Sequence, residues 1–202
     1  MRSVLVWLMV LLGGGIVTAT PAKSEVGSCQ PAELFATDNT DPLFEIQANV
    51  TIALTGATVT GSTLLDGVFW SKTLQQSSNE RSREFHLCSA DETTLHTAAE
   101  ALRRQFNQEA VLTFFYLPQE APDANAVVIT VPDVDFARFR DAFVADAAAR
   151  NRLQGGSVAT TGHTLILVAG NGDRDVARRL VGEAGGSWNA ATIAYGNREF
   201  AD

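Results

Sequence analysis

Three side chains in the first half of this 202-residue chain could contribute to a small-molecule site. Trp70 lies in a short apolar segment beside a polar stretch, His86 lies in an alternating segment, and Tyr116 lies near the end of an apolar run. An imidazole titrates near neutral pH, and Trp and Tyr each join an apolar ring to a polar group. We take Trp70, His86 and Tyr116 as candidate ligand-binding residues, and the sequence identifies no catalytic residue.

The chain contains two cysteines, Cys29 and Cys88. In an oxidising compartment, an isolated pair of cysteines is most simply a disulfide. His86 precedes Cys88 by two residues, so both side chains would share one face of a strand. A zinc site needs a third and usually a fourth protein ligand, which the sequence does not supply. We therefore predict a Cys29–Cys88 disulfide, no metal site and no cofactor.

Common catalytic motifs are absent from the sequence. There is no Gly-x-Ser-x-Gly nucleophile motif and no Walker-type Gly-Lys-Ser/Thr motif. The carboxylate pairs Asp133/Asp135 and Asp173/Asp175 open predicted helices, where the positive end of the helix dipole favours acids. The sequence thus favours a non-enzymatic protein over an enzyme.

The N-terminus predicts export. Arg2 is followed by an apolar and glycine-containing segment at residues 4–17, and then by small residues before Lys23. This order is typical of a secretory signal peptide, cleaved after Ala19 or, as we prefer, after Ala22. A retained membrane anchor and a lipid-modified Cys29 are the alternatives. We expect a secreted or periplasmic protein with no membrane contact beyond the signal peptide.

The charge balance limits the partners of the protein. The formal net charge is −8 at pH 7. Such a chain lacks the basic surface of a nucleic-acid-binding protein and the polybasic patch that binds anionic lipids. The expected partner is an exported protein or a small ligand.

The first half has the pattern of a small α+β unit. Strict alternation of apolar residues predicts a strand at Phe44–Leu54, and shorter strands are expected at residues 68–72 and 83–89. A helix begins after Ser89, which forms a capping box with Glu92, and packs through an apolar stripe ending at Phe106. Residues 110–117 are apolar on both faces, which predicts a strand inside a covered sheet. We expect the first helix of the unit to be lost or shortened to residues 58–65, and a loop at 75–82.

The second half predicts the order strand, helix, strand, strand, helix, strand. An apolar strand at residues 126–131 precedes a helix with an aromatic stripe at Phe136, Phe139 and Phe143. A hairpin at residues 157–169, a helix at 172–184 and a strand at 190–200 complete the pattern.

We therefore predict an α+β protein with a C-terminal ferredoxin-like βαββαβ unit, which could pair with a degenerate N-terminal α+β unit. The expected domains are a signal peptide at residues 1–22, a polar lead-in at 23–42, an N-terminal α+β unit at 43–117, a linker at 118–125 and the ferredoxin-like unit at 126–202.

The functional prediction is an exported binding or interaction module of unknown ligand. Two alternatives are a secreted enzyme with a site between the two units, and an inhibitor or pro-domain-like partner of another exported protein.

Overall fold

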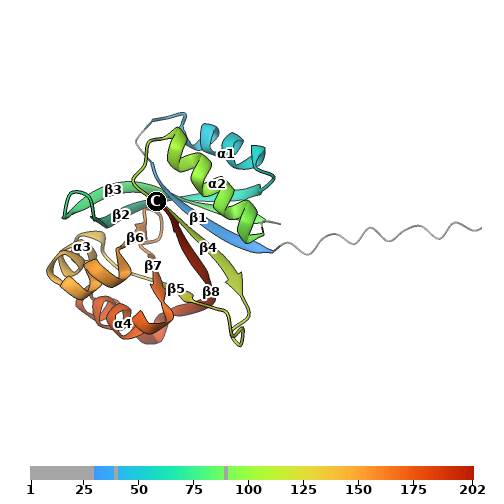
Figure 1. Ribbon diagram of the computed structural model, residues 1–202. Coiled ribbons are helices and arrows are strands. Elements are labelled where there is room, and N and C mark those ends of the chain that lie inside the picture. The colour runs from blue at the N-terminus through green and yellow to red at the C-terminus, as the bar shows by residue number, and fades with distance from the viewer. Residues whose placement is uncertain (1–29, 39–40, 89–90) are drawn as a thin grey trace, which may run out of the picture.

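The computed structural model describes residues 30–38, 41–88 and 91–202. The main strands and helices of this part of the chain are labelled in Figure 1. They are β1 (Pro31–Thr37), α1 (Phe44–Leu54), β2 (Thr58–Ser71), β3 (Gln76–Cys88), α2 (Glu92–Gln105), β4 (Val111–Leu117), β5 (Ala126–Val131), α3 (Phe136–Ala145), a π-helical turn (Ala149–Leu153), β6 (Gly155–Ala159), β7 (Leu165–Gly170), α4 (Arg174–Glu183) and β8 (Thr192–Ala201).

The eight strands form one closed antiparallel barrel in the order β1-β3-β2-β6-β7-β5-β8-β4. Strands from the two halves of the chain pair at two seams. At one seam Leu65 of β2 lies opposite Ala159 of β6, and at the other Phe114 of β4 lies opposite Arg198 of β8. Closure leaves no strand of the barrel with an unpaired edge, and an unpaired edge would invite association with other chains.

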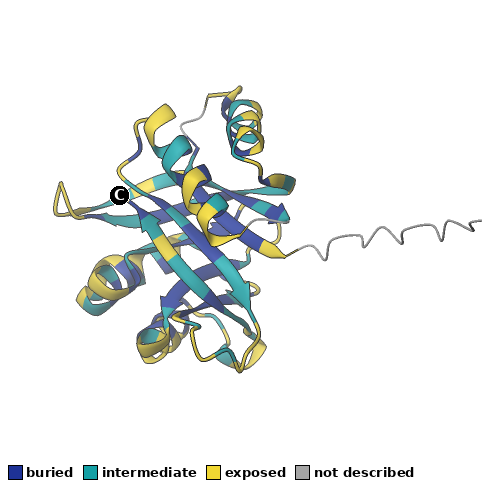
Figure 2. Ribbon diagram, turned by 45° about the vertical axis from the view of Figure 1, so that its right-hand side comes forward, coloured by how far each residue is buried: buried dark blue, intermediate teal, exposed yellow. Residues whose placement is uncertain are grey.

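Two helical layers cover the outside of the barrel, as Figure 1 shows. Helices α1 and α2 pack on the strands of the first half, and α3 and α4 pack on those of the second half. In Figure 2, exposed residues (yellow) lie mainly in the helices and loops, whereas many residues of the strands are buried (dark blue). The largest fully buried side chains between these helices and the barrel are Leu34, Phe44, Ile52, Phe85, Leu95, Leu102, Ile129, Phe139, Phe143 and Leu165.

A third apolar cluster fills the barrel interior. It draws on β1, β2 and β4 through Phe35, Leu65 and Phe114, and on β5 to β7 through Ala126, Val128, Ala159, Ile166 and Val168. Successive strand residues point to opposite sides of a sheet, so residues two positions from these also face inward. This alternation points Glu33 and Tyr116 into the barrel, because they lie two positions from Phe35 and Phe114.

Side-chain caps fix the starts of two helices. Asp91 accepts a hydrogen bond from the backbone N–H of Thr94 and begins α2, and Asp135 does the same with Arg138 and begins α3. Each cap satisfies an amide that the helix itself leaves unpaired. The expected helix is therefore confirmed, but Asp91 rather than Ser89 caps it, and Ser89 lies outside the described residues.

The predicted ferredoxin-like unit is wrong as a description of the fold. The strands of the second half do not form a separate sheet, because β6 pairs with β2 and β8 pairs with β4. The two halves instead share one barrel and one interior. The expectation failed because a local sequence pattern gives the order of strands but does not reveal how the outer strands of each half are paired.

The secondary structure of the first half also needs correction. Phe44–Leu54 is the helix α1 and not a strand, and residues 58–65 belong to the long strand β2 and not to a helix. The expected loop at residues 75–82 lies mostly in β3, and the expected lead-in at 23–42 contains β1.

Most elements predicted for the remainder of the chain are confirmed. The strand at residues 110–117 is β4, and the strand, helix, hairpin, helix and strand expected after residue 125 are β5, α3, the β6–β7 pair, α4 and β8. Residues 1–22, and with them the predicted signal peptide, lie outside the described residues. Within the described part, no helix combines the length and apolarity needed to cross a bilayer.

Candidate functional site

A pocket of about 310 Å³ opens at one end of the barrel. Its apolar walls come from several strands and include four aromatic side chains, Phe35, Phe69, Trp70 and Phe200. The mouths of β-barrels are common positions for small-molecule sites, and this volume is at the lower end of the usual range. The pocket is therefore suited to a compact ligand with a large apolar part.

Two glycines allow the Phe69 ring to lie against the barrel wall. A Cβ atom on Gly67 would approach the Phe69 ring to 2.4 Å, and one on Gly155 would approach it to 2.3 Å. Both contacts are far inside van der Waals distance, so side chains at these positions would displace the ring. Glycines on β2 and β6 thus fix an aromatic surface at the pocket before any ligand binds.

The charged groups of the pocket are mainly acidic. Glu80, Glu109 and Asp202 line it together with a single cation, Lys72. Glu80 accepts hydrogen bonds of 2.8 Å from the hydroxyls of Thr37 and Ser78. The Ser71 hydroxyl donates to Glu109 at 2.8 Å and is the main cause of the lowered pKa of that carboxyl. Negative charge at the entrance disfavours anionic ligands and favours neutral or cationic ones.

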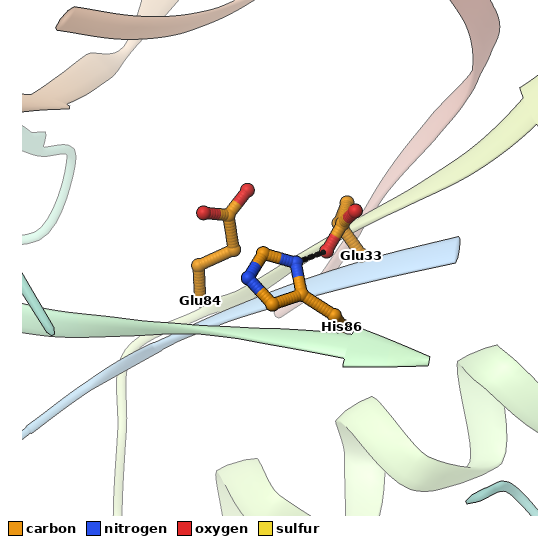
Figure 3. Close-up of side chains that lie close together, drawn as sticks. All are labelled: Glu33, Glu84 and His86. Atoms are coloured by element: carbon orange, nitrogen blue, oxygen red, sulfur yellow. Dashed lines mark hydrogen bonds and ion pairs between the residues drawn. The ribbon is translucent and has the colours of Figure 1, made fainter. Parts of the chain in front are cut away.

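A separate polar cluster lies within the barrel on β1 and β3. Figure 3 shows Glu33, Glu84 and His86 pointing toward one another. His86 Nδ1 lies 2.7 Å from Glu33 Oε2, and His86 Nε2 lies 2.9 Å from the Thr63 hydroxyl. The Tyr116 hydroxyl donates to Glu33 Oε1 at 3.3 Å. We call Glu33, Glu84 and His86 the acid–histidine cluster.

The acid–histidine cluster is shielded from solvent to different degrees. Glu33 is 8% exposed and Glu84 is 7% exposed, whereas the His86 side chain is 37% exposed. The two carboxylates therefore lie deep, and the imidazole forms the approach to them from solvent. One potential ligand atom from each of the three residues lies within 4.8 Å of the other two, so the cluster could hold a metal ion.

Burial and mutual charge shift the pKa values in this region. Burial is the main cause that raises the pKa of Glu84 to about 7, and the negative charge of Glu33 adds to it, while His86 opposes it. The hydrogen bond to Glu33 raises the pKa of His86 although burial opposes the rise. Burial, followed by the charge of Glu33, raises the pKa of Tyr116. The Glu84–His86 pair can therefore bind or release protons near neutral pH.

The structure brings two of the three candidate ligand-binding residues together. His86 and Tyr116 both contact Glu33 from different strands. Trp70 instead lines the pocket at the barrel mouth, which neither His86 nor Tyr116 reaches. Arg150 lies over the Trp70 ring, with its guanidinium carbon 5.3 Å from the ring centroid. The predicted trio is thus divided between the two sites.

Sequence reasoning did not identify Glu33 and Glu84. Glu84 lies two residues before His86 on β3, so strand alternation alone places both on one face. That signal was available in the sequence. Glu33 could not be found in this way, because it lies on β1 in a segment expected to lack regular structure, and its partner His86 is distant in the chain.

The predicted disulfide lies partly outside the described residues. Cys88 is the last residue of β3 and lies opposite Pro31 of β1. Cys29 is not among the described residues, so its pairing with Cys88 remains a prediction.

Comparisons with known proteins do not assign the chain to a family. No family model matches it, and no curated protein sequence matches it. Among solved structures, an unknown protein from Galdieria sulphuraria covers 83% of this chain and 98% of its own, with 13% identity and a TM-score of 0.29. An anthrone oxidase-like protein covers 88% of this chain and 94% of its own, with 13% identity and a TM-score of 0.25. Similarity at this level supports no conclusion about the present chain.

Proposed function

We propose that the protein is an exported binding protein that takes a small neutral or cationic ligand with an aromatic or aliphatic body in the pocket at the barrel mouth. The observation that carries this proposal is the pocket of about 310 Å³ with its four aromatic side chains. Apolar walls supply most of the binding free energy in such sites, and a few polar groups orient the ligand. Here Glu80 and Glu109 are the groups that can accept hydrogen bonds from it.

Preorganisation of the wall also supports ligand binding. The Phe69 ring occupies the space left by Gly67 and Gly155, so its position does not depend on the ligand. A side chain that is already in place loses little conformational entropy when a ligand binds. Deeper in the barrel, by contrast, the side chains of the apolar cluster fill the interior.

The test uses N-phenyl-1-naphthylamine, an uncharged aromatic probe whose fluorescence rises in apolar sites. We expect saturable binding to the wild-type protein. Phe69→Ala is expected to weaken binding by at least about tenfold, because it removes much of one apolar wall. Ser78→Trp is expected to abolish binding, because the indole would enter the pocket that Ser78 lines.

The matched control is Leu54→Ala, which removes an apolar side chain that is 83% exposed on α1 and does not line the pocket. Its affinity for the probe should equal that of the wild type. Unsaturable binding to the wild type, or unchanged affinity in Ser78→Trp, would show that the probe does not use this pocket.

Export and the disulfide form part of the same proposal. The supporting observation is the signal-peptide pattern before Lys23 and the pair Cys29 and Cys88. An intact mass of the protein recovered from the exported fraction should correspond to a chain beginning at Thr20 or Lys23, lighter by the two hydrogen atoms that disulfide formation removes. A full-length mass, or two thiols that react with an alkylating agent before reduction, would contradict this part.

The alternative of an exported enzyme is favoured by one observation: His86 and Glu84 lie in one cluster, burial raises the pKa of Glu84 to about 7, and the hydrogen bond to Glu33 raises the pKa of His86. Such groups can transfer protons at physiological pH. Turnover of a small molecule that is lost in His86→Gln, while binding of the aromatic probe at the barrel mouth is retained, would establish it in place of a pure binding role.

A further inference from the structure

The Glu84 side chain is largely buried, and its carboxylate has no hydrogen-bond donor among the described residues. Glu84 is 7% exposed, and among the described residues no backbone or side-chain group donates a hydrogen bond to it. Buried carboxylates in proteins are normally satisfied by donors, by a cation or by a metal ion. No donor in the described part of the chain occupies the Glu84 carboxylate, which leaves it open to a cation or a metal ion.

The surroundings of Glu84 point to a cation rather than to a neutral donor. The Glu33 carboxylate lies in the same cluster and adds a second negative charge. Two carboxylates that share a low-dielectric space repel each other, and a divalent cation placed between them removes that repulsion. The His86 imidazole lies close to both carboxylates (Figure 3), and one potential ligand atom from each of the three residues lies within 4.8 Å of the other two.

We propose that Glu33, Glu84 and His86 bind one divalent first-row transition metal ion inside the barrel. Two carboxylate oxygens and one imidazole nitrogen form a donor set suited to Zn²⁺ or Mn²⁺. The potential ligand atoms lie within 4.8 Å of one another, so small side-chain rotations bring them to coordination distance. The 2.7 Å contact between His86 Nδ1 and Glu33 Oε2 opens when the ion takes the place of the shared proton.

Two further hydrogen bonds hold the proposed ligands in place. The Thr63 hydroxyl lies 2.9 Å from His86 Nε2 and can accept its N–H when Nδ1 faces the metal ion. The Tyr116 hydroxyl donates to Glu33 Oε1 and leaves Oε2 directed at the cluster. Partners of this kind orient metal ligands and set their tautomer. Thr63 and Tyr116 are therefore positioning residues.

The site has an entrance and an open coordination position. The His86 side chain is 37% exposed, so the ion can reach the buried carboxylates past the imidazole. Three protein ligands leave at least one position for water or for another ligand, as in catalytic zinc sites. The inference does not depend on the proposed ligand pocket, because none of the three residues lines that pocket.

The experiment is calorimetric titration of Zn²⁺ into the full exported chain after removal of metals with a chelator. We expect one ion per chain. Loss of one outer-shell partner usually weakens metal binding 10- to 100-fold, so Glu84→Gln and His86→Gln should each weaken it by more than about 100-fold. Thr63→Val, which keeps all three ligands, should weaken it by about tenfold.

The matched control is His96→Gln. His96 pairs with Glu199 at 3.1 Å, but this pair is exposed, and neither residue belongs to the cluster. Zn²⁺ affinity should be unchanged in this variant. Far-ultraviolet circular dichroism of the metal-free proteins verifies that each variant is folded. If a variant of one of the three ligands does not fold, the Zn²⁺ affinity of Thr63→Val tests the proposal.

Binding of Co²⁺ gives an independent signal, because its visible absorption reports directly coordinated ligands. The spectrum should change in Glu84→Gln and remain unchanged in His96→Gln. The proposal is overturned if the wild type takes up no stoichiometric Zn²⁺, if Glu84→Gln binds as tightly as the wild type, or if His96→Gln loses the ion equally.

Discussion

Replacement of Glu84 by Gln is expected to stabilise the metal-free protein above neutral pH. In the folded protein the pKa of Glu84 is raised from 4.5 to about 7, chiefly because the carboxyl is buried and secondly because Glu33 is negatively charged. A carboxyl with a raised pKa in the folded state favours folding fully below its unfolded pKa. That contribution is lost as the pH rises through the folded pKa.

The magnitude follows from the shift. One pKa unit corresponds to about 1.4 kcal/mol, so the wild type should lose about 3 kcal/mol of stability between about pH 4 and pH 8 through this group. Gln has the same shape and no charge, so the variant avoids that loss. The Glu84 charge also raises the pKa of His86, so it stabilises the protonated imidazole in the wild type. The variant lacks this attraction, which offsets part of its gain in stability, and about 3 kcal/mol is therefore an upper value.

The assay is urea denaturation of both proteins at about pH 4, 6 and 8, in the presence of a chelator. The difference in the free energy of unfolding should be smallest at the lowest pH and should grow in favour of the variant as the pH rises. Glu199→Gln serves as the control, because the Glu199 side chain is 55% exposed. A difference that stays constant across this range, or one that grows in favour of the wild type, would refute the reasoning. Added Zn²⁺ should reverse the sign at pH 8 if the proposed metal site is correct.

Three other substitutions test the packing and the ion pairs. Phe143→Ala removes a fully buried ring beneath α3 and should lower the free energy of unfolding by about 3–5 kcal/mol, measured with urea. Gly155→Ala places a Cβ 2.3 Å from a ring carbon of Phe69, and it should cost about 1–3 kcal/mol and reduce probe binding at the barrel mouth. Asp146→Asn should destabilise slightly at neutral pH and have no effect near pH 2. The pKa of Asp146 is lowered, because hydrogen bonds from Arg179 and two backbone amides outweigh the effect of burial. That stabilisation is present above the unfolded pKa and is lost as the pH falls through the folded pKa.

The sequence predicted the individual strands and helices of the second half well, although not the fold they form, because these elements have unambiguous periods. The Phe139 and Phe143 stripe packs against the barrel as expected, with both side chains fully buried. Helix α1 was predicted as a strand for a specific reason. Phe44, Ala48 and Ile52 recur every fourth residue, which fits both a helical face and an alternating strand. Ile46 and Val50 completed the alternation, but they are exposed in the structure, at 62% and 56%.

Only part of the candidate site could be predicted from the sequence. His86 and Tyr116 were selected for their chemistry, and both contact Glu33. Their meeting depends on β1 pairing with both β3 and β4, which are long-range pairings that no local pattern specifies. The pocket depends on barrel closure in the same way, since its walls include residues of both halves.

The closed barrel has a consequence for the way the protein is synthesised. β8 is the last strand in chain order and occupies the position between β5 and β4. Until Thr192–Ala201 has left the ribosome, β4 and β5 each lack a neighbour, and the ring remains open with apolar interior residues such as Phe114 uncovered. Closure therefore waits for β8, and the nascent chain must be kept from associating through the two open strands until then.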